Sequence, residues 1–261
     1  MLARPRGSEV PTVLVVAHYD TVNQGTAFDA RWVRFVPAGL RAYALFPPMA
    51  VLLSRSRRKS PGRLFRLAML AGAASMIQWQ LLGGHNPGAN DNGSGVAVAL
   101  AAAERLAAGT AHGDAWFLFT DGEEAGITGM RAFLKAHAGE LGRSAVLNLE
   151  AQGAGGLYYL GREGMLIRYR PATKLLAHIE AFAACGGPAP QRRDQPAFST
   201  DALAARALGL SAVTVVRLDE KGLMPGWHHH DYLERIDGTA LEESVDFAAG
   251  FTAFLLDVFN R

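Results

Sequence analysis

The chain has 261 residues, which is enough for one large α/β domain with a substantial core. Its formal charge of +2 is close to neutral, and basic residues gather only between Arg55 and Arg63, so the composition argues against a nucleic-acid-binding protein. The single cysteine, Cys185, excludes an internal disulfide framework and argues against a thiolate metal site. Met1–Val10 has no apolar core of the kind found in signal peptides, so we expect no cleavable secretory signal.

Short apolar runs recur along the chain and predict strands that are buried on both faces. They lie at Thr12–Ala17, Ala115–Thr120, Ala145–Leu149, Leu157–Leu160 and Ala212–Val216. Helical patterns lie between and after them, at Gly95–Ala108, Met130–His137, Thr173–Ala184, Ala202–Leu208 and Leu241–Phe259. This alternation predicts an α/β fold, with a mixed, mostly parallel central sheet, helices on both faces and ligands at the carboxyl ends of the strands.

One apolar segment interrupts this alternation. Phe35–Ser54 and Leu64–Leu82 flank the basic loop, and each is close to the roughly 20 residues that cross a bilayer. Both stretches contain charged or amide side chains, and the first also contains Pro47 and Pro48. We predict a single domain over 1–261 with an apolar helical insertion at about 35–84. This insertion is interpreted as a helical lid, a hairpin that contacts the membrane surface or a true span, which leaves a cytoplasmic or a membrane-associated location open.

Imidazole and carboxylate side chains follow three of the predicted strands and also occupy two loops. They are His18, Asp20, Asp91, Glu123, Glu124, Glu150 and the histidines at 228–230. Each has an ordinary alternative explanation, since a lone histidine can be structural and Asp91 can cap a helix. The adjacent acids Glu123 and Glu124 would repel each other unless a cation or a proton intervened. A set of imidazoles and carboxylates without thiolates suits zinc or a similar divalent ion in a hydrolase.

The order of these motifs resembles the co-catalytic zinc aminopeptidases, a family that includes bacterial leucyl aminopeptidases and glutamate carboxypeptidase. The motifs are Val13–Asp20, Gly88–Gly95, Asp121–Gly126, His228 and Ile236-Asp237. Asn148–Gly156 is especially similar to the membrane-bound vacuolar and endoplasmic-reticulum branch of that family. The resemblance implies a three-layer sandwich of the zinc exopeptidase type.

The resemblance also implies a role for each candidate site residue. Two zinc ions would be bridged by Asp91. His18 and Glu150 would complete one metal site, and Glu124 with a histidine of the 228–230 run would complete the other. Among these three we prefer His228, because Gly226-Trp227-His228 resembles the aromatic–histidine pair of relatives, and His229 comes second. Glu123 would be the general base, and Asp20 would orient His18 by accepting its other ring proton.

The sequence therefore predicts a zinc-dependent exopeptidase, an aminopeptidase that removes N-terminal residues from peptides. Two alternatives share the fold: a single-zinc glutaminyl cyclase and a catalytically silent binding module. The intact loop Gly88–Gly95 favours two metal ions over one. Whether the free end that is recognised is amino or carboxyl, which side chain is preferred, and the oligomeric state do not follow from the motifs.

Overall fold

A computed structural model describes most of the chain outside the predicted insertion. The described residues are 2–3, 11–24, 83–109, 114–137, 139–142, 144–164, 167–195 and 198–259, together with single positions at 31, 35, 38, 39, 70, 72–74, 77 and 81. Most of the predicted insertion at about 35–84 lies outside these residues, so its three interpretations stay predictions. Within the described part of the chain, we find no helix with the length and apolar character that crossing a membrane requires.

The centre of the molecule is a seven-stranded sheet in the order β1-β3-β2-β4-β7-β5-β6. The strands are β1 Leu2–Ala3, β2 Val13–His18, β3 Ala115–Thr120, β4 Ala145–Glu150, β5 Gly156–Glu163, β6 Gln191–Gln195 and β7 Ser211–Leu218. β2 pairs in parallel with both β3 and β4, β4 with β7, and β5 with β6. β1 runs antiparallel to β3, and β5 runs antiparallel to β7. The prediction of a mixed, mostly parallel sheet is therefore confirmed.

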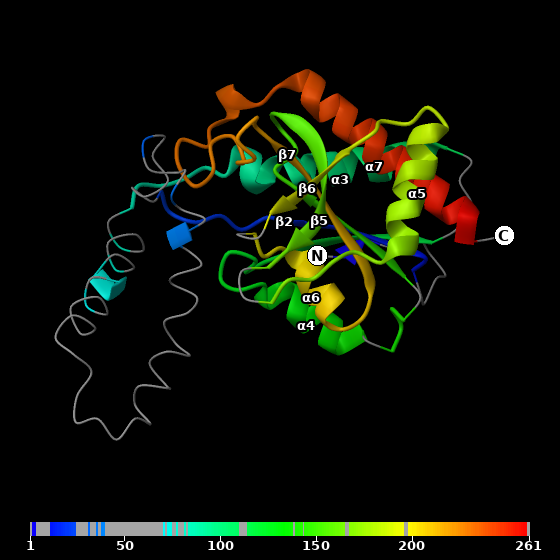
Figure 1. Cartoon of the computed structure of the whole chain (residues 1–261), viewed down its shortest axis with the longest axis horizontal. Helices are drawn as coiled ribbons and strands as arrows, with labels where there is room; N and C mark the ends of the chain where they lie inside the picture. The colour runs from blue at the N-terminus through cyan, green and yellow to red at the C-terminus, as the bar shows by residue number, and fades with distance from the viewer. Residues whose placement is uncertain are drawn as a thin grey trace.

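Helices cover both faces of the sheet and give the molecule three layers (Figure 1). The helices are α3 Gly95–Ala108, α4 Thr128–His137, α5 Thr173–Ala184, α6 Asp201–Ala207 and α7 Gly238–Phe259, with short turns at η4 Ala89–Ser94 and η5 Leu233–Arg235. α3, α5 and α7 pack on one face, and α4 and α6 pack on the other.

The side chains of β2 point alternately into the two apolar layers of the core, one on each face of the sheet. Val13, Val15 and Ala17 face the α3–α5–α7 layer, whereas Leu14 and Val16 face the α4–α6 layer. Because successive side chains of a strand point to opposite faces, an unbroken apolar run suits a strand that is covered on both sides. The strand that ends at His18 is therefore buried along its whole length.

Two strands differ from the sequence-based prediction. β6, Gln191–Gln195, has a polar sequence and largely exposed side chains, so it contains no apolar run that would predict a strand. It lies at one edge of the sheet, where charged residues discourage pairing with a further chain. β1 is two residues long and pairs with Phe117 and Leu118 of β3; a strand of this length is too short to give a periodic signal.

Candidate active site

The first candidate ligands lie where two neighbouring strands end. β2 ends at His18 and β4 ends at Glu150, and the two strands run in parallel with Val16 opposite Asn148. Because the carboxyl ends of parallel strands meet at one edge of the sheet, both side chains arrive at the same point. The Nε2 atom of His18 lies 2.8 Å from Oε1 of Glu150, and both residues are buried.

Asp91 reaches the same point from the loop before α3. Its Oδ1 atom lies 3.3 Å from Nε2 of His18. Gly95 permits this approach, because a Cβ atom there would lie 2.8 Å from the carbonyl oxygen of Leu149. Asn92 fastens the loop to the end of β4: its Nδ2 donates to the Leu149 carbonyl at 2.9 Å, and its Oδ1 accepts a backbone N–H from the turn after β4 at 3.0 Å. The loop that carries Asp91 is thus held against the strand that carries Glu150.

Asp91 belongs to two groups of candidate ligands. The groups are His18, Asp91 and Glu150, and Asp91, Glu124 and His228, and within each group the ligand atoms lie within 4.8 Å of one another. Among the described residues, His229 and His230 belong to neither group. The backbone of His228 is left-handed, with φ 49°, a conformation that is costly for a residue other than glycine and is often found at functional sites.

The electrostatics of the two groups fit a divalent cation. Asp91 Oδ1 and Glu124 Oε1 are buried and accept no hydrogen bond, which is costly for a carboxylate oxygen. Burial, reinforced by the charge of Asp91, raises the pKa of Glu124 well above its usual range. Burial also raises the pKa of Glu150 to about 7, although His18 acts in the opposite direction. A cation at this position would satisfy both free oxygens and stabilise the ionised carboxylates, and oxygen and nitrogen ligands of this kind suit zinc.

The surroundings of His18 and His228 shift the pKa values of these two histidines in opposite directions. Burial acts to lower the pKa of His18, but the charge of Glu150 and contacts with Asp20 and Asp91 outweigh it and raise that pKa well above its usual value. Burial lowers the pKa of His228 to about 4, so this imidazole is neutral and able to act as a ligand across the physiological range.

Asp20 joins two of the ligand-bearing segments. Its Oδ1 atom lies 3.4 Å from Nδ1 of His18, and its own carbonyl oxygen is closer to that nitrogen, at 3.1 Å. Its two carboxylate oxygens accept the backbone N–H groups of Glu123 and Glu124, each at 3.1 Å. The sequence predicted only the contact with His18. In the structure Asp20 also fixes the loop that carries both acids after β3.

Glu123 lies beside the cluster without belonging to either ligand group. Burial raises its pKa well above the usual range, and the negative charges of Glu150 and Glu124 act in the same direction. Many general acids and bases are carboxyl groups whose pKa is raised by burial and by neighbouring negative charges. The position of Glu123 is therefore compatible with proton transfer.

Two further buried carboxyl groups were not predicted as site residues. Asp201, at the start of α6, accepts a hydrogen bond of 2.5 Å from the hydroxyl of Thr120, and burial raises its pKa to about 6. Asp231 accepts the backbone N–H groups of Asn90 and Asp91 at 2.8 and 2.7 Å. Neither position has a sequence signal of its own, because each acts through groups that lie far away along the chain.

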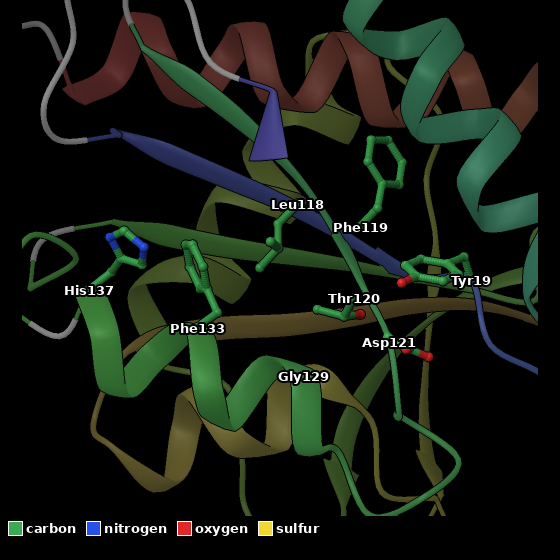
Figure 2. A pocket seen from close by; sticks show the side chains of 8 residues that line it. All are labelled: Tyr19, Leu118, Phe119, Thr120, Asp121, Gly129, Phe133 and His137. Atoms are coloured by element: carbon green, nitrogen blue, oxygen red, sulfur yellow. The ribbon is translucent and has the colours of Figure 1, made fainter. Parts of the chain in front are cut away.

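A cavity of about 300 Å³ lies beside this cluster, between the end of β3 and α4 (Figure 2). Its lining residues are Tyr19, Leu118, Phe119, Thr120, Asp121, Gly129, Phe133 and His137. Gly129, Phe133 and His137 recur every four residues on α4 and so share one face of that helix. The five candidate ligands do not line the cavity, but Tyr19 directly follows His18, and Asp121 begins the loop that carries Glu124.

The chain combines a mixed sheet with two groups of imidazole and carboxylate side chains near the ends of its strands. This combination makes it a candidate metallohydrolase. The chain belongs to peptidase family M28, whose sequence profile matches residues 68–252. The matched range includes Asp91, Glu123, Glu124, Glu150 and His228 but neither His18 nor Asp20. The comparison with curated proteins gave no match.

Several solved structures share the fold at low sequence identity. BSAP, a zinc aminopeptidase from Bacillus subtilis, has a TM-score of 0.61 and 19% identity over 98% of this chain and 48% of its own. The LapA aminopeptidase of Legionella pneumophila has a TM-score of 0.63 and 13% identity over 98% of this chain and 54% of its own. A glutaminyl cyclase from Porphyromonas gingivalis has a TM-score of 0.58 and 18% identity over 100% of this chain and 77% of its own. The chain thus spans about half the length of the two aminopeptidases.

Proposed function

We propose that the chain is a zinc-dependent aminopeptidase with two metal ions. The observation that carries this proposal is the sharing of Asp91 between two groups of ligands, with Glu123 beside them. His18 and Glu150 would hold one ion and Glu124 and His228 the other, with Asp91 between them. Membership of peptidase family M28 supports a hydrolase of peptide bonds, and fold likeness to zinc aminopeptidases supports action at the amino end.

The two ions would supply Lewis-acid polarisation of the scissile carbonyl and would lower the pKa of the attacking water. The chain's own contribution to proton transfer is Glu123, whose carboxylate accepts a proton from that water and later delivers it to the leaving amine. Asp20 holds the backbone N–H of Glu123 at 3.1 Å and so limits the movement of the base. Burial of the ligand cluster lowers the local dielectric and so strengthens the electrostatic stabilisation of charge that develops on the carbonyl oxygen.

The experiment combines metal analysis with a substrate panel. Plasma mass spectrometry of the purified protein should give close to two zinc ions per chain. Aminoacyl chromogenic amides should be hydrolysed, chelation should stop the reaction, and added zinc should restore it. A matched set of peptides blocked at the amino end and free at the carboxyl end should be left intact. Absence of bound metal and of hydrolysis after zinc addition would instead support a silent binding module.

A second candidate function has a specific observation in its favour. Glutaminyl cyclases are among the structures of similar fold, and two of those compared match over the whole of this chain. Chromatography of a peptide with N-terminal glutamine separates the two activities. Ring closure without loss of a residue would identify a cyclase, whereas release of free glutamine would identify an aminopeptidase. The presence of a second complete ligand group around Asp91 favours the aminopeptidase.

A further inference from the structure

Asp231 connects the two loops that supply Asp91 and His228. Its side chain is buried, with an exposed fraction of 0% for the residue, and its two carboxylate oxygens are used separately. Oδ1 accepts the backbone N–H of Asn90 at 2.8 Å, and Oδ2 accepts the backbone N–H of Asp91 at 2.7 Å. The side chain of Asp231 thus contacts the backbone of one candidate ligand and lies three residues after another.

The backbone of Asp231 adds further bonds between the same two segments. Its carbonyl oxygen accepts the N–H of Ala89 at 3.2 Å, and its N–H donates to Oδ1 of Asn86 at 3.3 Å. Asn90 also bonds to the loop that carries His228, because its Nδ2 donates to the carbonyl oxygen of Pro225 at 3.0 Å. The two loops are therefore joined on both sides of Asp231, and this residue is the centre of the connection.

The two hydrogen bonds to the Asp231 carboxylate are the strongest bonds between these loops. Hydrogen bonds from N–H groups to an ionised oxygen are shorter and about twice as strong as those between neutral groups. Both N–H groups are buried with their residues, so they would lose their acceptor without Asp231, and an unsatisfied buried donor is costly. The loop would relieve this cost by shifting, and a shift of the Asp91 backbone changes the distance of its side chain from His228.

We propose that Asp231 is a positioning residue that sets the separation of Asp91 and His228 and thereby the affinity of the ligand group Asp91–Glu124–His228 for its metal ion. The proposal rests on the proposed function, because it requires that this group binds metal. It differs from that function in naming a residue that contacts no metal. Its negative charge close to Asp91 adds to the attraction for a cation at the same position.

The test measures metal affinity in three variants of the full chain. Asp231→Ala removes both acceptors, and Asp231→Asn keeps one oxygen but presents an NH₂ group to the second N–H. Asp246→Ala is the control: Asp246 is an acid on the exposed side of α7, it pairs with Arg105 in the last turn of α3, and it belongs to neither ligand group. Each protein is stripped of metal and titrated with Zn²⁺ against a competing chelator and, separately, with Co²⁺ while its visible absorption is recorded.

Weaker binding of Zn²⁺ by about 10- to 100-fold is expected in Asp231→Ala, a smaller loss in Asp231→Asn, and no change in Asp246→Ala. The Co²⁺ spectrum of the weakened site should also change in shape, which a general loss of stability would not cause. If Asp231→Ala does not fold by circular dichroism, Asp231→Asn decides the test. Equal Zn²⁺ affinity and equal spectra in wild type and Asp231→Asn would overturn the proposal. A wild-type chain that binds no Zn²⁺ would contradict the proposed function itself, and this outcome is recognised before any variant is compared.

Discussion

Glu123 and Glu124 are adjacent in sequence, yet the structure separates their surroundings. Glu124 shares a ligand group with Asp91 and His228, whereas Glu123 lies outside both groups with a raised pKa that burial produces. Two neighbouring carboxyl groups can therefore serve different purposes, one as a metal ligand and one in proton transfer. Asp20 accepts the backbone N–H groups of both residues and so holds the loop from which the two side chains diverge.

Substitution of Glu123 by glutamine tests this division. Glu123→Gln keeps the size of the side chain but cannot accept the proton, so kcat should fall by about 10²- to 10⁴-fold. Zinc content per chain should stay at the wild-type value, because no ligand is removed. Glu104→Gln, the same change at an exposed acid of α3, serves as the control and should retain activity. Glu123→Gln protein that has lost metal would show that Glu123 is a ligand and would contradict the assigned role.

The sequence was sufficient to name the candidate ligands, but not to explain how they are held. His18 and Glu150 could be placed together because each follows an apolar run, and parallel strands end at one edge. The choice among three consecutive histidines depended on resemblance, and only the folded backbone shows that His228 points into the cluster. Asp231 could not be found from a pattern, because a carboxylate that accepts backbone N–H groups has no partner residue type to search for.

At the scale of elements, apolar periodicity located the sheet and helices that cover the site. The predicted helix Gly95–Ala108 agrees with α3, and the predicted strand Ala115–Thr120 agrees with β3. β6 was missed, because an exposed edge strand can be polar on both faces. Periodicity also could not show that α6, besides its apolar contacts with the sheet, is attached to it by an ion pair.

A buried ion pair joins α6 to β5. Nη1 of Arg206 lies 3.0 Å from Oε1 of Glu163, and the hydroxyl groups of Thr200 and Thr214 donate to the same carboxylate at 2.8 and 3.2 Å. Burial raises the pKa of Glu163, although Arg206 acts in the opposite direction. Because α6 begins at Asp201, this pair also fixes the residue that accepts the hydroxyl of Thr120 at the end of β3.

Breaking this pair from one side should be strongly destabilising. Arg206→Met leaves the Glu163 carboxyl buried without its counter-charge, and urea denaturation should show a loss of about 3 to 5 kcal/mol in the free energy of unfolding. The pKa of Glu163 rises further in this variant, so its loss of stability should grow as pH is raised from 5 to 8. The double variant Glu163→Gln/Arg206→Met, which buries no charge, should recover most of the stability. A double variant as unstable as the single one would show that packing of Arg206, and not its charge, holds α6.

At the scale of the whole molecule, the buried acids of the site make the stability of the metal-free protein dependent on pH. The pKa of Glu150 is raised from 4.5 to about 7, and the pKa values of Asp201 and Asp231 are raised from 3.8 to about 6. Each raised pKa contributes stability that is complete below the ordinary value and is lost as pH rises through the raised one. His18, whose pKa is also raised, acts in the same direction. His228 acts oppositely, but only between its folded value of about 4 and its ordinary value of 6.5.

Above pH 6.5 the remaining shifts all act in one direction, which leads to a prediction for the metal-free chain. After chelation, its melting temperature should fall between pH 6.5 and pH 8, because Glu150 must ionise in a buried cluster that contains several other acids. With zinc bound, the same carboxylates are stabilised in their ionised form, so the difference in melting temperature between metal-loaded and metal-free protein should widen over this range. Paired thermal melts at the two pH values, with zinc or with chelator, measure this difference directly. If the difference narrows or stays constant as pH rises, the buried acids do not exchange protons for a cation, and the ligand assignment built on Asp91, Glu124 and Glu150 is wrong.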